Sequence, residues 1–90
     1  MHICPGFSLR ELGDDHLVIG EGSDRNIHAR RVVRLNGSAA FLWRSVEGKD
    51  FGVGDLALLL REEYGIDTAT SLSDAAAILD AWEKAGLVEK

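Results

Sequence analysis

The stretch that decides the fold is Val32-Val33-Arg34-Leu35-Asn36-Gly37-Ser38-Ala39-Ala40-Phe41-Leu42-Trp43. Its paired β-branched residues, Val32 and Val33, favour an extended strand. Asn36-Gly37 then predicts a turn, because both residues tolerate left-handed backbone angles that other residues avoid. The remaining residues favour a helix, and Asn36 or Ser38 is placed to cap its first free N–H groups. The stretch therefore predicts the passage from a small sheet to a group of helices.

The residues before this passage alternate between apolar and polar side chains, which is typical of half-buried strands. The expected strands are Phe7–Leu12, His16–Gly20 and Arg31–Leu35, the first two forming a hairpin. Residues 21–26 are polar and predict an exposed loop, whereas residues 27–30 are either loop or the start of the third strand. In that strand, alternation places Arg31, Val33 and Leu35 on one face, and we expect Val33 and Leu35 to face the helices.

Apolar residues at helical spacing follow the passage and predict three helices. These run from Gly37 or Ser38 to Val46, from Val53 to Tyr64, and from Thr68 to Ala85, with Asp67 placed to cap the third. The core-facing residues expected on the third helix are Leu72, Ala75, Ala76, Leu79, Trp82 and Ala85. Ninety residues predict one domain, 1–90, of α+β class: an N-terminal three-stranded antiparallel sheet followed by three helices that pack on it.

Composition excludes several classes of function. The net charge of −5 argues against nucleic acid as a partner, since such binding depends on neutralising phosphates. A local basic group is either a solvated loop or an anion-attracting patch, and comprises Arg25, His28, Arg30, Arg31 and Arg34. No apolar run is long enough to span a membrane, and the start of the chain lacks the features of a signal peptide. A single cysteine cannot form an internal disulfide, which favours a cytoplasmic location.

Side chains that carry chemistry are not grouped along the sequence. Cys4 lies near an end that we expect to be mobile, without a base close by in the sequence. The three histidines are not spaced as metal ligands, and Asp14-Asp15 is typical of a solvated turn. No glycine-rich phosphate loop follows a strand. We therefore expect no catalytic residue, no metal site and no cofactor.

Three segments resemble one known family. Residues 35–43, Leu-Asn-Gly-Ser-Ala-Ala-Phe-Leu-Trp, resemble the turn and helix start of the PqqD-like family, the recognition elements for ribosomally made, post-translationally modified peptides (RiPPs). Residues 62–67 and 82–88 resemble the helix end and the closing Gly-Leu of the same family. The resemblance covers nearly the whole chain. It implies a winged helix-turn-helix-like fold without catalysis. It also implies binding of a precursor's leader peptide and its presentation to a modifying enzyme such as a radical SAM maturase.

The resemblance also implies the site, in which the leader adds as a strand to the third strand and rests against the third helix. The residues permit this, because an edge strand offers unpaired N–H and C=O groups to an extended peptide. The expected peptide-binding residues are Arg31, Val32, Val33, Arg34 and Leu35 on the strand, and Ala75, Ile78, Leu79 and Trp82 on the helix. Each apolar residue among them is alternatively a core residue, and the two arginines would attract an acidic leader.

Two other functions stay open from the sequence: DNA binding through a winged helix, and an adaptor role on a partner protein. A DNA-reading helix carries basic or amide side chains on its outer face, whereas the third expected helix offers only Lys84 there. An open sheet edge is compatible with a monomer and with a homodimer.

Overall fold

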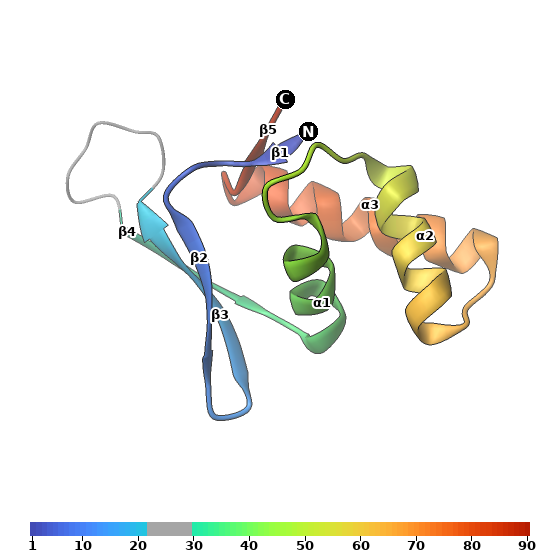
Figure 1. Cartoon of the computed structure of the whole chain (residues 1–90), viewed down its shortest axis with the longest axis horizontal. Helices are drawn as coiled ribbons and strands as arrows, with labels where there is room; N and C mark the ends of the chain where they lie inside the picture. The colour runs from blue at the N-terminus through green and yellow to red at the C-terminus, as the bar shows by residue number, and fades with distance from the viewer. Residues whose placement is uncertain (22–29) are drawn as a thin grey trace.

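The structure, a computed structural model, describes residues 1–21 and 30–90, without the side chains of Glu21, Arg30 and Arg31. Arg25 and His28 of the basic group lie outside the described residues, as do most of the expected loop 21–26 and of the segment 27–30 that was left open. The main elements are β2 (Phe7–Leu12), β3 (Asp15–Glu21), β4 (Arg30–Leu35), α1 (Gly37–Val46), α2 (Val53–Tyr64) and α3 (Thr68–Lys84). Two short strands at the ends of the chain are β1 (His2–Ile3) and β5 (Val88–Glu89). This confirms the predicted α+β class, with the sheet on one side and the helices on the other (Figure 1).

Strands β2, β3 and β4 form one antiparallel sheet in that order, so β4 lies at an edge. Leu9, Val18 and Val33 are directly opposite one another across the three strands and therefore share a face. Val18 is fully buried, Leu35 is buried and Val33 packs partly buried against the core. The prediction that Val33 and Leu35 face the helices is confirmed.

The opposite face of the sheet is exposed at its margins. Leu12 and Val32 retain 60% and 59% of their accessible surface there. Val32 pairs with Ile19 of β3, and Arg34 is the other described side chain of β4 on this face. The two faces of β4 therefore differ, because only the one with Val33 and Leu35 meets the helices.

Asn36 makes the turn from β4 into α1. Its Oδ1 accepts hydrogen bonds from the backbone N–H of Ala39, at 2.8 Å, and from the Ser38 hydroxyl, at 3.0 Å. Asn36 is thus the N-cap of α1, one of the two residues that the sequence offered for this role. The cap fixes the direction in which the chain leaves the edge strand.

The core between sheet and helices is built around aromatic side chains. The rings of Trp43 and Trp82 meet edge to face, with centroids 5.4 Å apart, and Phe51 meets Trp82 in the same manner at 6.3 Å. Trp43 is fully buried, and its indole N–H has no hydrogen-bond partner within the described residues. These contacts connect α1, the segment before α2, and α3 in one hydrophobic cluster.

The face that helix α3 presents to the core agrees only in part with the prediction. Leu72 is 43% exposed and Ala76 is exposed, whereas Ser71 is fully buried and donates its hydroxyl to the Thr68 carbonyl oxygen. The expected core positions Leu72 and Ala76 are therefore wrong, while Ala75, Leu79 and Trp82 are buried as predicted.

The two ends of the chain are fixed together. β1 pairs antiparallel with β5, the backbone N–H of Cys4 donates to the Leu87 carbonyl at 2.9 Å, and Phe51 N–H donates to the Met1 carbonyl at 2.7 Å. Cys4 is buried, so the expectation of a mobile end around it is wrong. Pairing between residues so distant in sequence leaves no local pattern.

Among the described residues, no helix has the length and apolar character needed to cross a bilayer.

Candidate functional site

A groove of about 260 Å³ runs between the edge strand β4 and helix α3. It is lined by Val33, Arg34, Leu35, Asn36, Ala39, Ala77, Ile78, Ala81 and Trp82. Most of these residues are apolar, and the helix side contributes two alanines one turn apart, Ala77 and Ala81. Because alanine side chains are short, the helix wall leaves room for side chains of another molecule.

The backbone of β4 borders this groove with a free edge. Within the described residues β4 has β3 on one side and no strand on the other. Alternate residues of an edge strand direct their N–H and C=O groups away from the sheet. The groove therefore combines unpaired backbone groups with an apolar floor, which is the arrangement required for addition of an extended peptide.

The structure distributes the predicted site residues over three locations. Val33, Leu35, Ile78 and Trp82 line the groove, as does part of Arg34. Val32 lies on the opposite face of the sheet, and Ala75 and Leu79 are buried in the core beneath the helix wall. For Arg31, only the backbone position in β4, opposite Gly20, is described.

Four residues that line the groove were not in the predicted set: Asn36, Ala39, Ala77 and Ala81. Ala77 and Ala81 carry a recognisable signal, because small residues four positions apart share a helix face. Both were expected on the outer face of α3 and both are exposed, so the sequence did not show that a groove passes over them.

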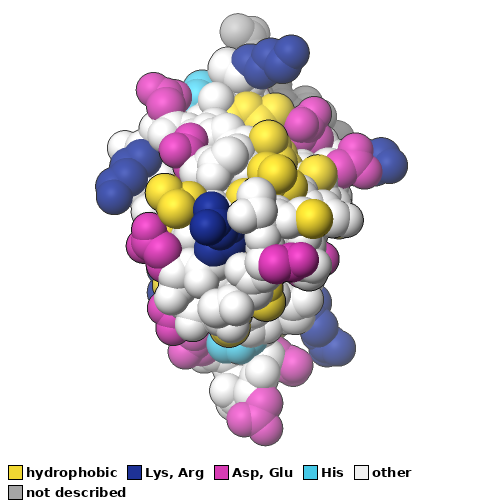
Figure 2. Space-filling view, turned by 90° about the vertical axis from the view of Figure 1, so that its right-hand side faces the viewer, with side chains coloured by type: hydrophobic (Ala, Val, Ile, Leu, Met, Phe, Trp, Pro, Cys, Tyr) yellow, Lys and Arg dark blue, Asp and Glu magenta, His cyan; other side chains and the backbone are white. Residues whose placement is uncertain are grey.

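The charged side chains near the groove are mostly paired or acidic. Arg34 lies 3.7 Å from Asp15 across the sheet, and its side chain is 73% exposed. On α3, Lys84 forms an ion pair with Asp80 at 2.9 Å, and the hydrogen bond and charge of Asp80 raise the pKa of Lys84. Figure 2 shows carboxylates, Lys and Arg side chains and small hydrophobic groups interspersed on the end of the molecule where α2 and α3 lie. A face of mixed charge on a chain with net charge −5 is poorly suited to phosphates.

The comparisons with known proteins agree with this geometry. The family described as Coenzyme PQQ synthesis protein D (PqqD) matches residues 25–88, well over half of the chain. The match includes β4, the Asn36 turn and all of α3, which together form the groove. The chain has no significant match among curated proteins or among solved structures. The family match confirms the resemblance noted from the sequence, and the chain belongs to the PqqD family of RiPP precursor recognition elements.

Proposed function

We propose that this chain binds the leader segment of a ribosomally made precursor peptide and presents it to a modifying enzyme, such as a radical SAM maturase, in the cytoplasm. The leader adds to β4 as a further antiparallel strand, and its alternate side chains enter the groove between β4 and α3. The observation that carries the proposal is the free edge of β4 directly beside an apolar groove. Membership of the PqqD family supports a peptide partner in this kind of biosynthesis.

Each wall of the groove has a separate role in this proposal. The backbone of residues 31–35 provides the hydrogen bonds that hold any extended peptide. Val33 and Leu35 form the floor, and Ile78 and Trp82 on α3 contact the inserted leader side chains. Trp82 packs edge to face against Trp43 and Phe51, so this wall is already formed in the free chain. A preformed site loses little conformational entropy on binding.

The remaining predicted residues act indirectly in the same proposal. Ala75 and Leu79 hold α3 against the core and thereby set the width of the groove. Val32 and Arg34 point their side chains to the other sheet face, so they contribute mainly backbone groups. No observation favours DNA binding as a second function, because the acidic outer face of α3 opposes it.

The proposal is tested with a peptide selected from a random-peptide library on the immobilised full chain. Amide and methyl chemical shifts of the labelled chain are then recorded with and without that peptide. We expect the largest shifts in residues 31–36 and at Ala77, Ile78 and Ala81. Shifts confined to the β2–β3 hairpin, or failure to select any peptide, contradict the proposal. Genes for a short precursor and a maturase beside this gene would support it independently.

A further inference from the structure

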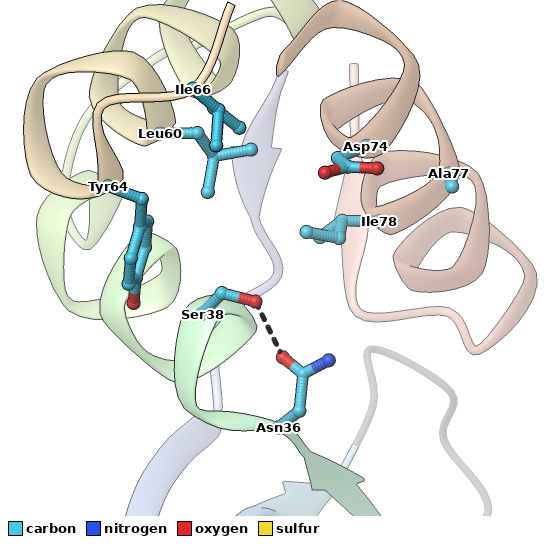
Figure 3. A pocket seen from close by; sticks show the side chains of 8 residues that line it. All are labelled: Asn36, Ser38, Leu60, Tyr64, Ile66, Asp74, Ala77 and Ile78. Carbon is cyan, nitrogen blue, oxygen red and sulfur yellow. Dashed lines mark hydrogen bonds between the residues drawn. The ribbon is translucent and has the colours of Figure 1, made fainter. Parts of the chain in front are cut away.

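A second cavity, of about 490 Å³, lies among the start of α1, the end of α2 and the middle of α3. Leu60, Ile66 and Ile78 point into it from different elements, and the Asp74 carboxylate stands on the α3 side (Figure 3). Asn36, Ser38, Tyr64 and Ala77 complete its lining. Its size falls within the range of small-ligand pockets, and its apolar walls with few polar groups are typical of sites that bind one bulky side chain.

This cavity adjoins the groove beside β4. Asn36, Ala77 and Ile78 line both of them, so they form the boundary that a chain lying in the groove would pass to reach the cavity. Strand β4 runs toward Asn36, where α1 begins. A peptide paired antiparallel with β4 runs the opposite way, and its residues upstream of the paired segment therefore lie at the mouth of the cavity.

Asn36 is oriented to assist a peptide at this point. The backbone N–H of Ala39 donates to the Asn36 side chain, and only the amide oxygen can accept this hydrogen bond. The positions of Oδ1 and Nδ2 are therefore unambiguous. The Nδ2 group consequently points away from the helix start, toward the side of α3 (Figure 3). It is available to donate to a peptide carbonyl where the peptide leaves the strand.

The negative charge of Asp74 in the cavity indicates which kind of side chain can bind there. Within the described residues, the Asp74 carboxylate has no ion-pair or hydrogen-bond partner, so it can pair with a cationic group of an occupant. The chain as a whole carries a net charge of −5. The Tyr64 ring is half-exposed at the rim and is held by Phe41 edge to face, with centroids 5.9 Å apart. The Asp74 carboxylate on one side of the cavity favours a cationic side chain in the occupant, and the Tyr64 ring lies on the opposite side (Figure 3).

We infer that this cavity is a second subsite for the same peptide, and that it binds a segment upstream of the added strand. This segment carries a bulky aliphatic or aromatic side chain, which enters between Leu60, Ile66 and Ile78. It also carries an adjacent Lys or Arg, which pairs with Asp74. The inference rests on the proposed function, since it requires the leader to lie along β4. It extends the recognised sequence beyond the strand and gives it a direction.

The experiment uses the folded full chain and two variants of it. A displayed random-peptide library is selected in parallel on the unmodified chain, on Asp74→Lys and on Asp80→Lys. Asp80 lies on the same helix and lines neither cavity, so its variant is a control for the same change in net charge. The methyl groups of Ile66, which lines only the second cavity, and Val33, which lines only the groove, report where a selected peptide lies.

The unmodified chain and Asp80→Lys are expected to enrich peptides with Lys or Arg beside a bulky apolar residue, upstream of an alternating apolar segment. Asp74→Lys is expected to enrich Asp or Glu at that same position. For a peptide selected on the unmodified chain, Asp74→Asn is expected to raise the Kd about two- to fivefold, as for other exposed ion pairs. Deleting the upstream segment is expected to weaken binding about tenfold or more, because a buried side chain is lost.

The outcomes distinguish failure of the second subsite from failure of the proposed function. Selected peptides that shift Val33 but not Ile66, with the same charge preference for all three chains, overturn the second subsite and leave the proposed function standing. Failure to enrich any peptide overturns both. Shifts at Ile66 together with the reversed charge preference support both.

Discussion

The groove beside β4 offers a direct test through Ala81, which lines it from α3 and is itself exposed. Replacing Ala81 with Trp places the largest side chain in a space of about 260 Å³, where it competes with a peptide side chain. Burying a side chain the size of Leu or Phe contributes about 1.5–3 kcal/mol. Since about 1.4 kcal/mol corresponds to a tenfold change, its displacement should raise the Kd about 10- to 140-fold.

The assay is isothermal titration with the library-selected peptide, and the matched control is Ala76→Trp. Ala76 is exposed on the same helix but lines neither the groove nor the adjoining cavity. Both substitutions lie on the surface, so each should change the free energy of unfolding by less than about 0.5 kcal/mol. The reasoning is refuted if Ala81→Trp binds the peptide as tightly as the unmodified chain, or if Ala76→Trp weakens binding equally.

Four further substitutions test the packing of the scaffold, its helix caps and the Asn36 donor. Gly20→Ala should lower the free energy of unfolding in urea by about 1–3 kcal/mol, because its Cβ would lie 2.1 Å from the Gly6 carbonyl oxygen. Gly54→Ala, in α2 with nothing within 4 Å of its Cβ, should instead raise it by about 0.5–1 kcal/mol, and similar effects for both would contradict this view of the packing. Asn36→Ser should keep the thermal midpoint, since serine also caps helices, yet weaken peptide binding about threefold or more through loss of the Nδ2 donor; unchanged affinity would exclude that donor. Hydrogen bonds from the Thr70 side chain, and to a smaller extent from its backbone N–H, lower the pKa of the Asp67 carboxyl at the N-cap of α3. The stabilisation of the fold by this carboxylate is therefore present at neutral pH and is lost in acid, below about pH 4. The thermal midpoint of Asp67→Asn should therefore fall less than that of the unmodified chain on acidification, and parallel pH profiles would contradict this.

Local patterns were sufficient for most of the elements. The strand Phe7–Leu12 and the helix Val53–Tyr64 have the predicted bounds, because alternation, glycine positions and caps are all encoded within a few residues. The Asn36 cap was recognisable for the same reason. The pairing of β1 with β5 was not, since two-residue strands have no periodicity and their partners lie at opposite ends of the chain.

The site was only partly predictable, for a reason specific to α3. This helix carries alanine at positions 69, 75, 76, 77 and 81, so its apolar arc is wide and its rotation about its own axis is poorly defined by sequence. Packing decides the rotation: Ser71 and Ala75 face inward, which leaves Ala77 and Ala81 on the groove. The winged helix-turn-helix-like description of the whole fold stays a prediction with which this arrangement is compatible.

The central claim is that β4 accepts an extended peptide as a further strand. Hydrogen–deuterium exchange of the individual amides of residues 31–35, measured by NMR with and without the selected peptide, tests it most directly. In the free chain, the amides that point away from β3 should exchange rapidly, and the alternate ones should be protected. Binding should protect the outward amides and leave the inward ones unchanged. A bound peptide that leaves the outward amides of β4 exchanging as in the free chain would contradict the account.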